Sequence, residues 1–182
     1  ELYKTGLCEV VALCDVDMGA PHTQKLISMF PKVPRFQDFR QMFDKMADKI
    51  DAVTVGVPDH AHFPITIEAM AHGKHVYVEK PMSRTFYEAE LMMLAAKKIN
   101  KIPALSETGC RGISQKQNWF TQTLWPVLQK YQLSYVLFWR NAWDNHKETY
   151  MAYPGSNTEQ DFRAFSSYPR TLFLGDINKK KK

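Results

Sequence analysis

The run DAVTVGV, residues 51–57, decides the fold class of this chain. It is short, apolar and rich in β-branched side chains, a pattern typical of a strand buried on both faces. Pro58 stops it, a helical pattern follows over residues 62–72, and residues 75–78 form the next apolar run. A crossover long enough to hold a helix is what parallel strands need, so these residues predict a parallel βαβ unit.

The same alternation continues in both directions along the chain. Further strands are expected at residues 9–15, 33–36, 102–106 and 134–139. Helices are expected at residues 23–30 after Pro21, 39–46 behind an Asp38 cap, 83–99, 118–131, and 158–165 behind a Thr158 cap. The sequence therefore predicts an α/β fold with a parallel sheet of alternating βα units. An antiparallel α+β fold is disfavoured, because no Asn-Gly or Asp-Gly turn separates two strands.

The composition is that of a globular protein. The 182 residues are 45% hydrophobic and 24% charged, which suits one domain of ordinary size or two small ones. The net charge of +5 comes partly from the run at residues 179–182, and the other basic side chains are scattered among acids. A scattered basic excess argues against nucleic acid as a partner.

No apolar stretch reaches the roughly 18 to 20 residues that a membrane-spanning helix needs, so we expect no membrane partner. The first residues carry no apolar signal-peptide segment. A chain expressed as it stands is therefore expected to be soluble and cytoplasmic, and upstream sequence could change this.

Neither the cysteines nor the histidines predict a metal site. Cys8, Cys14 and Cys110 are odd in number and lack metal-ligand spacing, so they are interpreted as small apolar residues in a reducing compartment. Only His60 and His62 lie close together among the histidines, and their i, i+2 spacing suits few helical metal sites.

Three motifs follow strand ends in the first half of the chain. Asp15 ends the first strand, VPDHAH (residues 57–62) follows the strand at 51–57, and VEKP (residues 78–81) follows the strand at 75–78. In this order and spacing they resemble the glucose-fructose oxidoreductase and inositol dehydrogenase family, Gfo/Idh/MocA, over residues 1–98.

The resemblance implies a role for each motif and NAD(P) as the cofactor. Asp15 would accept hydrogen bonds from the adenosine ribose hydroxyls. Lys80 would stand beside the nicotinamide and the substrate, where an ammonium can polarise a hydroxyl or carbonyl. Its turn would be shaped by Glu79 and Pro81. Three residues of the other motif would line the dinucleotide cleft: Pro58, Asp59 and His62.

The same comparison brings out two departures from the family. The family begins with a strand and a glycine-rich turn that cradles the pyrophosphate, and these 182 residues contain no GxGxxG. The family's proton-transfer domain should follow the third motif, and nothing after Asn100 resembles it. We therefore expect these residues by themselves to bind NAD(P) poorly.

A second resemblance covers residues 101–178. The blocks are PALSETG (103–109), NWF (118–120), SYVLFWRNA (134–142) and YPG (153–155), and they look like the C-terminal end of the family 26 glycoside hydrolases, the β-mannanases. These are barrel enzymes, so the segment would supply the last two βα units of a TIM barrel.

The second resemblance implies a sugar site. Glu107 would be the catalytic nucleophile at the end of barrel strand seven. Trp139 and Arg140, at the end of strand eight, would line the sugar subsites by stacking and hydrogen bonding. Retaining hydrolysis needs a second carboxyl about 5 to 5.5 Å away, and the family carries it on strand four, outside these residues.

These resemblances predict three segments: a Rossmann-like fragment without its first strand and GxGxxG (1–99), a barrel fragment (100–178) and a lysine tail (179–182). Three functions stay open: a hybrid without full catalytic activity, an NAD(P)-dependent oxidoreductase acting on a sugar or polyol, and a mannanase-like remnant that binds sugar. The expected partners are a sugar or mannan oligosaccharide and further copies of the chain, because an incomplete sheet exposes unpaired edges.

Overall fold

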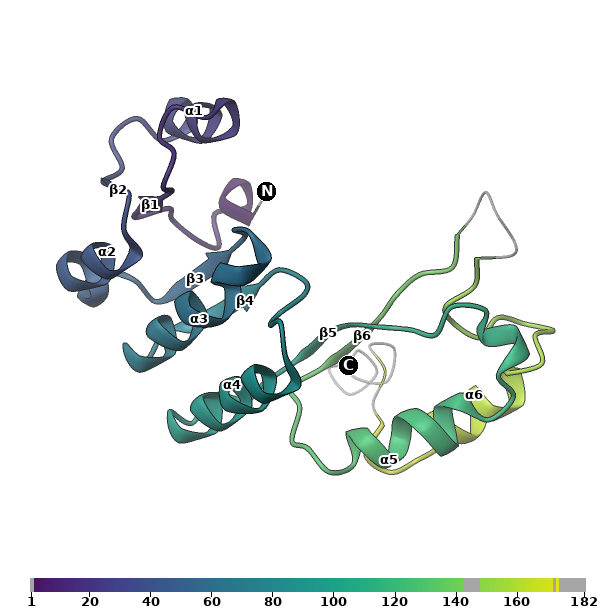
Figure 1. The fold of residues 1–182 in the computed structure, drawn as a ribbon. Coiled ribbons are helices and arrows are strands. Elements are labelled where there is room, and N and C mark those ends of the chain that lie inside the picture. Colours follow the sequence, from purple (N-terminus) through teal and green to yellow (C-terminus); the bar gives the residue numbers. More distant parts are fainter. Residues whose placement is uncertain (1, 143–147, 172, 174–182) are drawn as a thin grey trace. The chain divides into compact units, whose positions relative to one another are not determined.

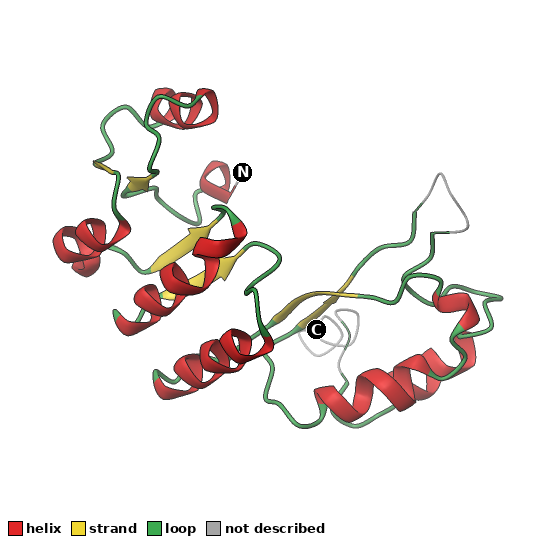
Figure 2. Ribbon diagram, in the orientation of Figure 1, coloured by secondary structure: helices red, strands yellow, loops and turns green. Residues whose placement is uncertain are grey.

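The computed structural model describes residues 2–142, 148–171 and 173. The chain divides into two compact units, Glu1–Lys101 and Ile102–Lys182, and each is taken by itself. The elements of both are drawn in Figures 1 and 2. The predicted lysine tail at residues 179–182 lies outside the described residues.

The first unit alternates short strands with helices, as expected. Its elements are a 3-10 helix at Leu2–Thr5, β1 at Leu13–Cys14, α1 at Pro21–Met29, β2 at Arg35–Phe36, α2 at Phe39–Met46, a 3-10 helix at Ala47–Lys49, β3 at Ala52–Val55, a 3-10 helix at Asp59–Ala61, α3 at His62–Ala71, β4 at His75–Val78 and α4 at Phe86–Lys98.

Every strand pair in the described residues is parallel, which confirms the α/β prediction. In the first unit β1 pairs with β2, and β3 pairs with β4 in a register that runs from Ala52 opposite His75 to Val55 opposite Val78. The strands form separate two-stranded sheets rather than one continuous sheet. The predicted strand at 9–15 is reduced to two residues, because residues 9–12 meet no neighbouring backbone with which to form a ladder.

The core of the first unit lies between its helices and strands. Met42 and Phe43 of α2 are buried together with Ile50, which precedes β3, and with Ala69 of α3. Partly buried apolar residues of all four strands pack on this cluster: Cys14, Phe36, Val53 and Val76. One apolar cluster therefore holds both strand pairs of the unit, as an α/β fold requires.

Capping residues fix where the helices begin. The Asp38 carboxylate accepts from the backbone N–H of Arg40, as its predicted cap role requires. At α4, Thr85 accepts from the backbone N–H of Glu88, whose carboxylate accepts from the N–H of Thr85 in return. This capping box starts α4 at Phe86, three residues after the predicted start of the helix.

The second unit consists of β5 at Leu105–Thr108, a 3-10 helix at Ile113–Gln115, a π-helix at Trp119–Leu124, α5 at Trp125–Leu128, β6 at Val136–Phe138 and α6 at Glu159–Ser166. β5 and β6 are parallel, with Leu105 opposite Val136 and Thr108 opposite Phe138 around an irregularity. Phe120, Leu124 and Phe165 form the centre of an aromatic core.

Two expectations for this unit need correction. The helix predicted at 118–131 begins as a π-helix, where the Asp161 carboxylate of α6 accepts from the backbone N–H groups of Phe120 and Thr121, and it ends at Leu128. Thr158 precedes α6 but its side chain caps nothing, and its hydroxyl lies 3.3 Å from the hydroxyl of Ser156. Among the described residues, no helix combines the length and the apolar character needed to cross a membrane.

Candidate functional site

Two loops lie at the same edge of the β3–β4 sheet. Because β3 and β4 are parallel and Val55 is opposite Val78, the segments that follow both strands emerge side by side. The backbone N–H of Glu79 donates to the carbonyl of Val55 over 2.9 Å, which continues the ladder into the second loop. A Cβ added to Gly56 would lie 3.8 Å from Cγ of Glu79, so the two chains stay close there.

These loops carry most of the residues that the first resemblance implicates. Pro58 and Asp59 follow β3, Glu79, Lys80 and Pro81 follow β4, and all five are exposed. The carbonyl of Pro58 accepts from the N–H of Ala61, which turns the chain into α3. An exposed ammonium beside a short turn can donate to a ligand oxygen at this edge.

His62 lies differently from its predicted place in the cofactor cleft. It is the first residue of α3 and is 1% exposed. Its Nδ1 lies 2.6 Å from the carbonyl oxygen of Pro81, so the ring packs beneath the turn that carries Lys80. Its Nε2 is buried without a hydrogen-bond partner. The sequence interpretation missed this contact, because nothing local in residues 57–62 indicates that the ring points inward.

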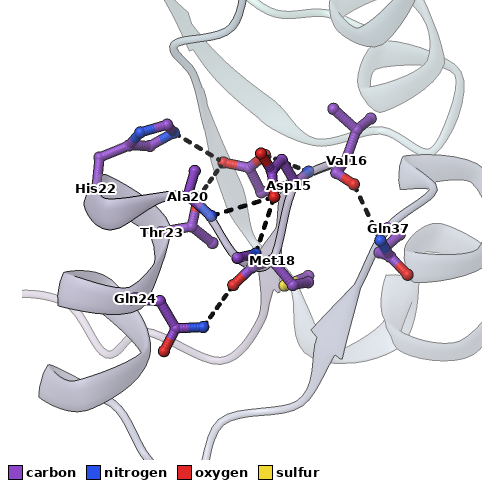
Figure 3. Close-up of polar contacts among 10 residues, drawn as sticks. Asp15, Val16, Met18, Ala20, His22, Thr23, Gln24 and Gln37 are labelled. Atoms are coloured by element: carbon purple, nitrogen blue, oxygen red, sulfur yellow. Dashed lines mark hydrogen bonds and ion pairs between the residues drawn. The ribbon is translucent and has the colours of Figure 1, made fainter.

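Asp15 directly follows β1 and is held by its own loop and by α1 (Figure 3). One carboxylate oxygen accepts from the N–H of Asp17 at 2.9 Å. The other accepts from the hydroxyl of Thr23 at 2.8 Å and lies 3.4 Å from Nε2 of His22. The N–H of Asp17 has the largest effect in lowering the pKa of the Asp15 carboxyl, with Thr23 and His22 adding to it against some burial. Asp15 is therefore an anion at neutral pH.

The residues present fit the two ends of a dinucleotide. The Asp15 side chain is 31% exposed, and a carboxylate has about four acceptor positions, so it can still accept from ribose hydroxyls. The exposed Lys80 suits the reacting end. No hydrogen bond or ion pair in the described residues joins Asp15 to the loop of Lys80.

The second unit carries its implicated residues at the ends of β5 and β6. The N–H of Trp139 donates to the carbonyl of Thr108 over 2.6 Å, which places the two strand ends together. Thr108 and Phe138 are opposite each other and half-buried, whereas their neighbours Glu107 and Trp139 are exposed, so Glu107 and Trp139 lie on the open face. Glu107, Trp139 and Arg140 are all exposed, and Trp139 is 47% exposed.

Gly109 allows the loops of this unit to pack closely. A Cβ added there would lie 3.2 Å from Cβ of Tyr150 and 3.3 Å from Cβ of Trp139. A larger residue at this position would press on Trp139 and Tyr150, so glycine is what allows these segments to approach so closely. Within residues 2–142, 148–171 and 173, no group of three His, Cys, Asp or Glu side chains could hold a metal ion.

The comparison with family models gives one match, to "Oxidoreductase family, NAD-binding Rossmann fold" (GFO_IDH_MocA), over residues 3–106. This chain belongs to that oxidoreductase family. The match includes the loops of Asp15, Asp59 and Lys80, and it ends at Ser106 inside β5. It therefore reaches past residue 98, where we expected the first resemblance to end.

Curated proteins similar to this chain include two whose names refer to sugar chemistry. An α-N-acetylgalactosaminidase of Shewanella oneidensis is 29% identical over a 150-residue alignment that covers 76% of this chain and 32% of that protein. A D-glucoside 3-dehydrogenase of Escherichia coli is 32% identical over 96 residues, which are 53% of this chain and 26% of that protein. The chain thus spans a third or less of the length of these relatives.

Among solved structures, a family 26 β-mannanase from Bacteroides ovatus is 27% identical with a TM-score of 0.47. The similarity covers 85% of this chain and 43% of the mannanase.

Proposed function

We propose that residues 3–106 form part of an NAD(P)-dependent oxidoreductase that acts on a sugar or a polyol. The observation that carries this proposal is the parallel register of β3 and β4, which sets the Pro58–Asp59 loop beside the turn of Lys80. Membership of an NAD-binding family supports the cofactor. The names of the two curated relatives support a sugar as the substrate class.

Each residue of the site has a distinct task in this proposal. The bound dinucleotide would supply or accept the hydride. The Asp15 carboxylate accepts hydrogen bonds from the adenosine ribose. The Lys80 ammonium donates to the substrate oxygen that gains or loses a proton, and its positive charge stabilises negative charge on that oxygen. Pro58 and Asp59 line the cleft between these ends.

A titration followed by the fluorescence of NADH and NADPH tests this function. We expect weak but saturable binding, because the chain lacks a GxGxxG turn, and a further loss of affinity in Asp15→Ala and in Lys80→Ala. Asp44→Ala, which removes an exposed carboxylate of α2 that has no role in the proposed site, is the matched control and should bind like the parent chain. No saturable binding at millimolar cofactor would remove this proposal.

A second function belongs to the second unit, where Glu107 and Trp139 share one face at the ends of β5 and β6. We propose that this unit is a glycosidase-like fragment that binds a mannan oligosaccharide, so that the chain is a hybrid. The Trp139 indole stacks on a sugar ring and Arg140 bonds its hydroxyls. The proposal gives Glu107 the role of nucleophile, and the second carboxyl that the resemblance implies belongs to a strand outside residues 101–178. The 182 residues alone are therefore expected to bind sugar without full catalytic activity.

Calorimetric titration with mannan oligosaccharides separates this second function from the first. Trp139→Ala should bind more weakly than the parent chain, because it loses the stacking surface. Tyr131→Ala removes another exposed aromatic side chain of the same unit and should bind equally well. Equal affinities of Trp139→Ala and the parent chain, or no binding by either, would end the proposal. Robust cleavage of mannan would contradict the expected lack of full activity.

A further inference from the structure

The turn that presents Lys80 is anchored by hydrogen bonds on both sides. Before it, the N–H of Glu79 donates to the carbonyl of Val55 in β3. After it, the carbonyl of Pro81 lies 2.6 Å from Nδ1 of His62 in α3. Lys80 is the one residue between these anchors, so its Cα is fixed from a strand on one side and a helix on the other.

The geometry also fixes the protonation of the His62 ring. A carbonyl oxygen can only accept, so a hydrogen bond at 2.6 Å requires that Nδ1 carries the proton. In the neutral ring Nε2 is then an unprotonated acceptor. This atom is buried and has no hydrogen-bond partner in the described residues.

An unpaired Nε2 argues against a purely structural reason for histidine at this place. Burying a polar atom without a partner is unfavourable, and an apolar side chain would fill a 1%-exposed position without that cost. An apolar side chain has no N–H that could donate to the Pro81 carbonyl. The specific gain from histidine is therefore the bond from Nδ1 to the turn.

We propose that His62 is a positioning residue for Lys80. Its Nδ1–H holds the Pro81 carbonyl, and this bond sets the backbone from which the exposed Lys80 ammonium extends. His62 then acts on the site through the turn and does not touch the cofactor. The inference rests on the proposed oxidoreductase function for its consequence, but the contact itself can be tested without any ligand.

Three variants at this position separate the roles of the two ring nitrogens. In His62→Asn the amide N–H stands at the same distance along the side chain as Nδ1 and can replace it. In His62→Gln the amide N–H stands where Nε2 was and cannot reach Pro81 in the same way. His62→Leu fills the position with an apolar side chain and removes both nitrogen atoms. Thr66→Val is the matched control, because Thr66 is buried one turn later on α3 and its hydroxyl also has no partner in the described residues.

Nuclear magnetic resonance reads the contact directly. In the parent chain, long-range ¹H–¹⁵N spectra should show His62 protonated at Nδ1. The carbonyl carbon of Pro81, detected through the amide of Met82, should shift upfield in His62→Leu and His62→Gln and stay near its parent position in His62→Asn and Thr66→Val. If His62→Leu does not fold, the contrast between His62→Asn and His62→Gln decides. A protonated Nε2 with a bare Nδ1, or a Pro81 carbon that does not respond to the loss of the ring, would overturn the inference.

The functional consequence is measured separately with NADH. Misplacing a reacting group by about an ångström costs up to roughly a hundredfold in rate. We therefore expect His62→Leu to lower NADH binding or turnover by up to that factor. His62→Asn should recover the activity of the parent chain. If the parent chain fails to bind NADH, the oxidoreductase proposal fails, while the Pro81 carbon still decides whether His62 holds the turn. If NADH binds and His62→Leu binds and reacts like the parent, the positioning role is wrong.

Discussion

The Thr23 hydroxyl donates to the Asp15 carboxylate over 2.8 Å and so joins the end of β1 to α1. Thr23 is 3% exposed, whereas the Asp15 side chain remains partly open to solvent. The bond therefore orients a carboxylate that can still receive a ligand from the open side. The proposed contact with a ribose would use this open side of the carboxylate.

Replacing Thr23 by valine should raise the pKa of the Asp15 carboxyl toward its ordinary value. The hydroxyl favours the ionised form, and Thr23→Val removes it with little change in volume. Because the folded-state pKa is lowered, Asp15 contributes stability above the ordinary carboxyl pKa and loses it as the pH falls through the folded-state pKa. Thr23→Val should therefore lose less stability on acidification.

Carboxyl ¹³C titration of Asp15 measures this prediction. Ser28→Ala removes an exposed hydroxyl of the same helix that bonds only the carbonyl of Lys25 among the described contacts, and it should leave the Asp15 titration unchanged. An unmoved Asp15 titration in Thr23→Val would show that the hydroxyl does not stabilise the anion.

Cys14 should be far less reactive than Cys8. Burial, followed by the carboxylates of Asp38 and Asp15, raises the pKa of the Cys14 thiol from 9.0 to about 11. The thiolate is the form that reacts, so near neutral pH the two-unit shift lowers the reactive fraction about 100-fold. Cys8 is exposed. Iodoacetamide at pH 8 should therefore label Cys8 first, as peptide mass spectrometry can follow.

The raised pKa also predicts how stability responds to alkali. Below pH 9 the Cys14 thiol is protonated in both the folded and the unfolded chain, so it gives the free energy of unfolding no pH dependence. Between pH 9 and about 11 the thiol ionises only in the unfolded chain, so the free energy of unfolding falls as the pH rises. Asp38→Asn should lower the Cys14 pKa and lessen that fall, while Asp48→Asn, which alters an exposed carboxylate in the same unit, should not. The labelling experiment tests the same raised pKa. Equal labelling of Cys8 and Cys14 at pH 8 would show that the Cys14 thiol is not protected by burial.

The helix and strand around the central motif could be predicted because local patterns determine them. Residues 62–72 and 75–78 were expected from periodicity and a glycine stop, and α3 and β4 occupy His62–Ala71 and His75–Val78. The place of the His62 ring could not be predicted, because its partner Pro81 is 19 residues away. The π-helical start at Trp119 likewise depends on Asp161, which belongs to a different helix.

Asp161 should be the most important carboxylate for the stability of the second unit. It is 8% exposed and accepts from the backbone N–H of Phe120 at 2.8 Å and of Thr121 at 3.3 Å, and from the Thr121 hydroxyl. These donors open the π-helix, where the first N–H groups have no partner within the helix. The carboxylate thus serves as a cap supplied by α6.

Asp161→Asn should lower the free energy of unfolding by about 2 kcal/mol, because charge-assisted bonds are weakened and an amide N–H₂ can face a backbone donor. Gln160→Ala, at an exposed position of the same helix, should change it by less than about 0.5 kcal/mol. Urea unfolding followed by tryptophan fluorescence measures both. Equal midpoints for Asp161→Asn and the parent chain would show that the cap is not stabilising.

The outer face of β6 should drive self-association. Side chains alternate along the strand, and Tyr135, Leu137 and Trp139 point away from the core with exposures of 53%, 59% and 47%. β6 has one partner strand in the described residues, so an apolar face and a free backbone edge occur together. We propose that a second copy of the chain covers this face in competition with the sugar proposed to stack on Trp139, since uncovered apolar edges pair readily.

Light scattering across a concentration series should therefore show a mass that rises with concentration. Leu137→Lys places a charge in the middle of the face and should return the chain toward the monomer, because pairing would bury that charge. Val127→Lys adds the same charge at another exposed apolar position of the second unit, on α5, and should leave association unchanged. Equal loss of association in both variants would point to net charge rather than the β6 face, and a monodisperse monomer at all concentrations would contradict self-association altogether.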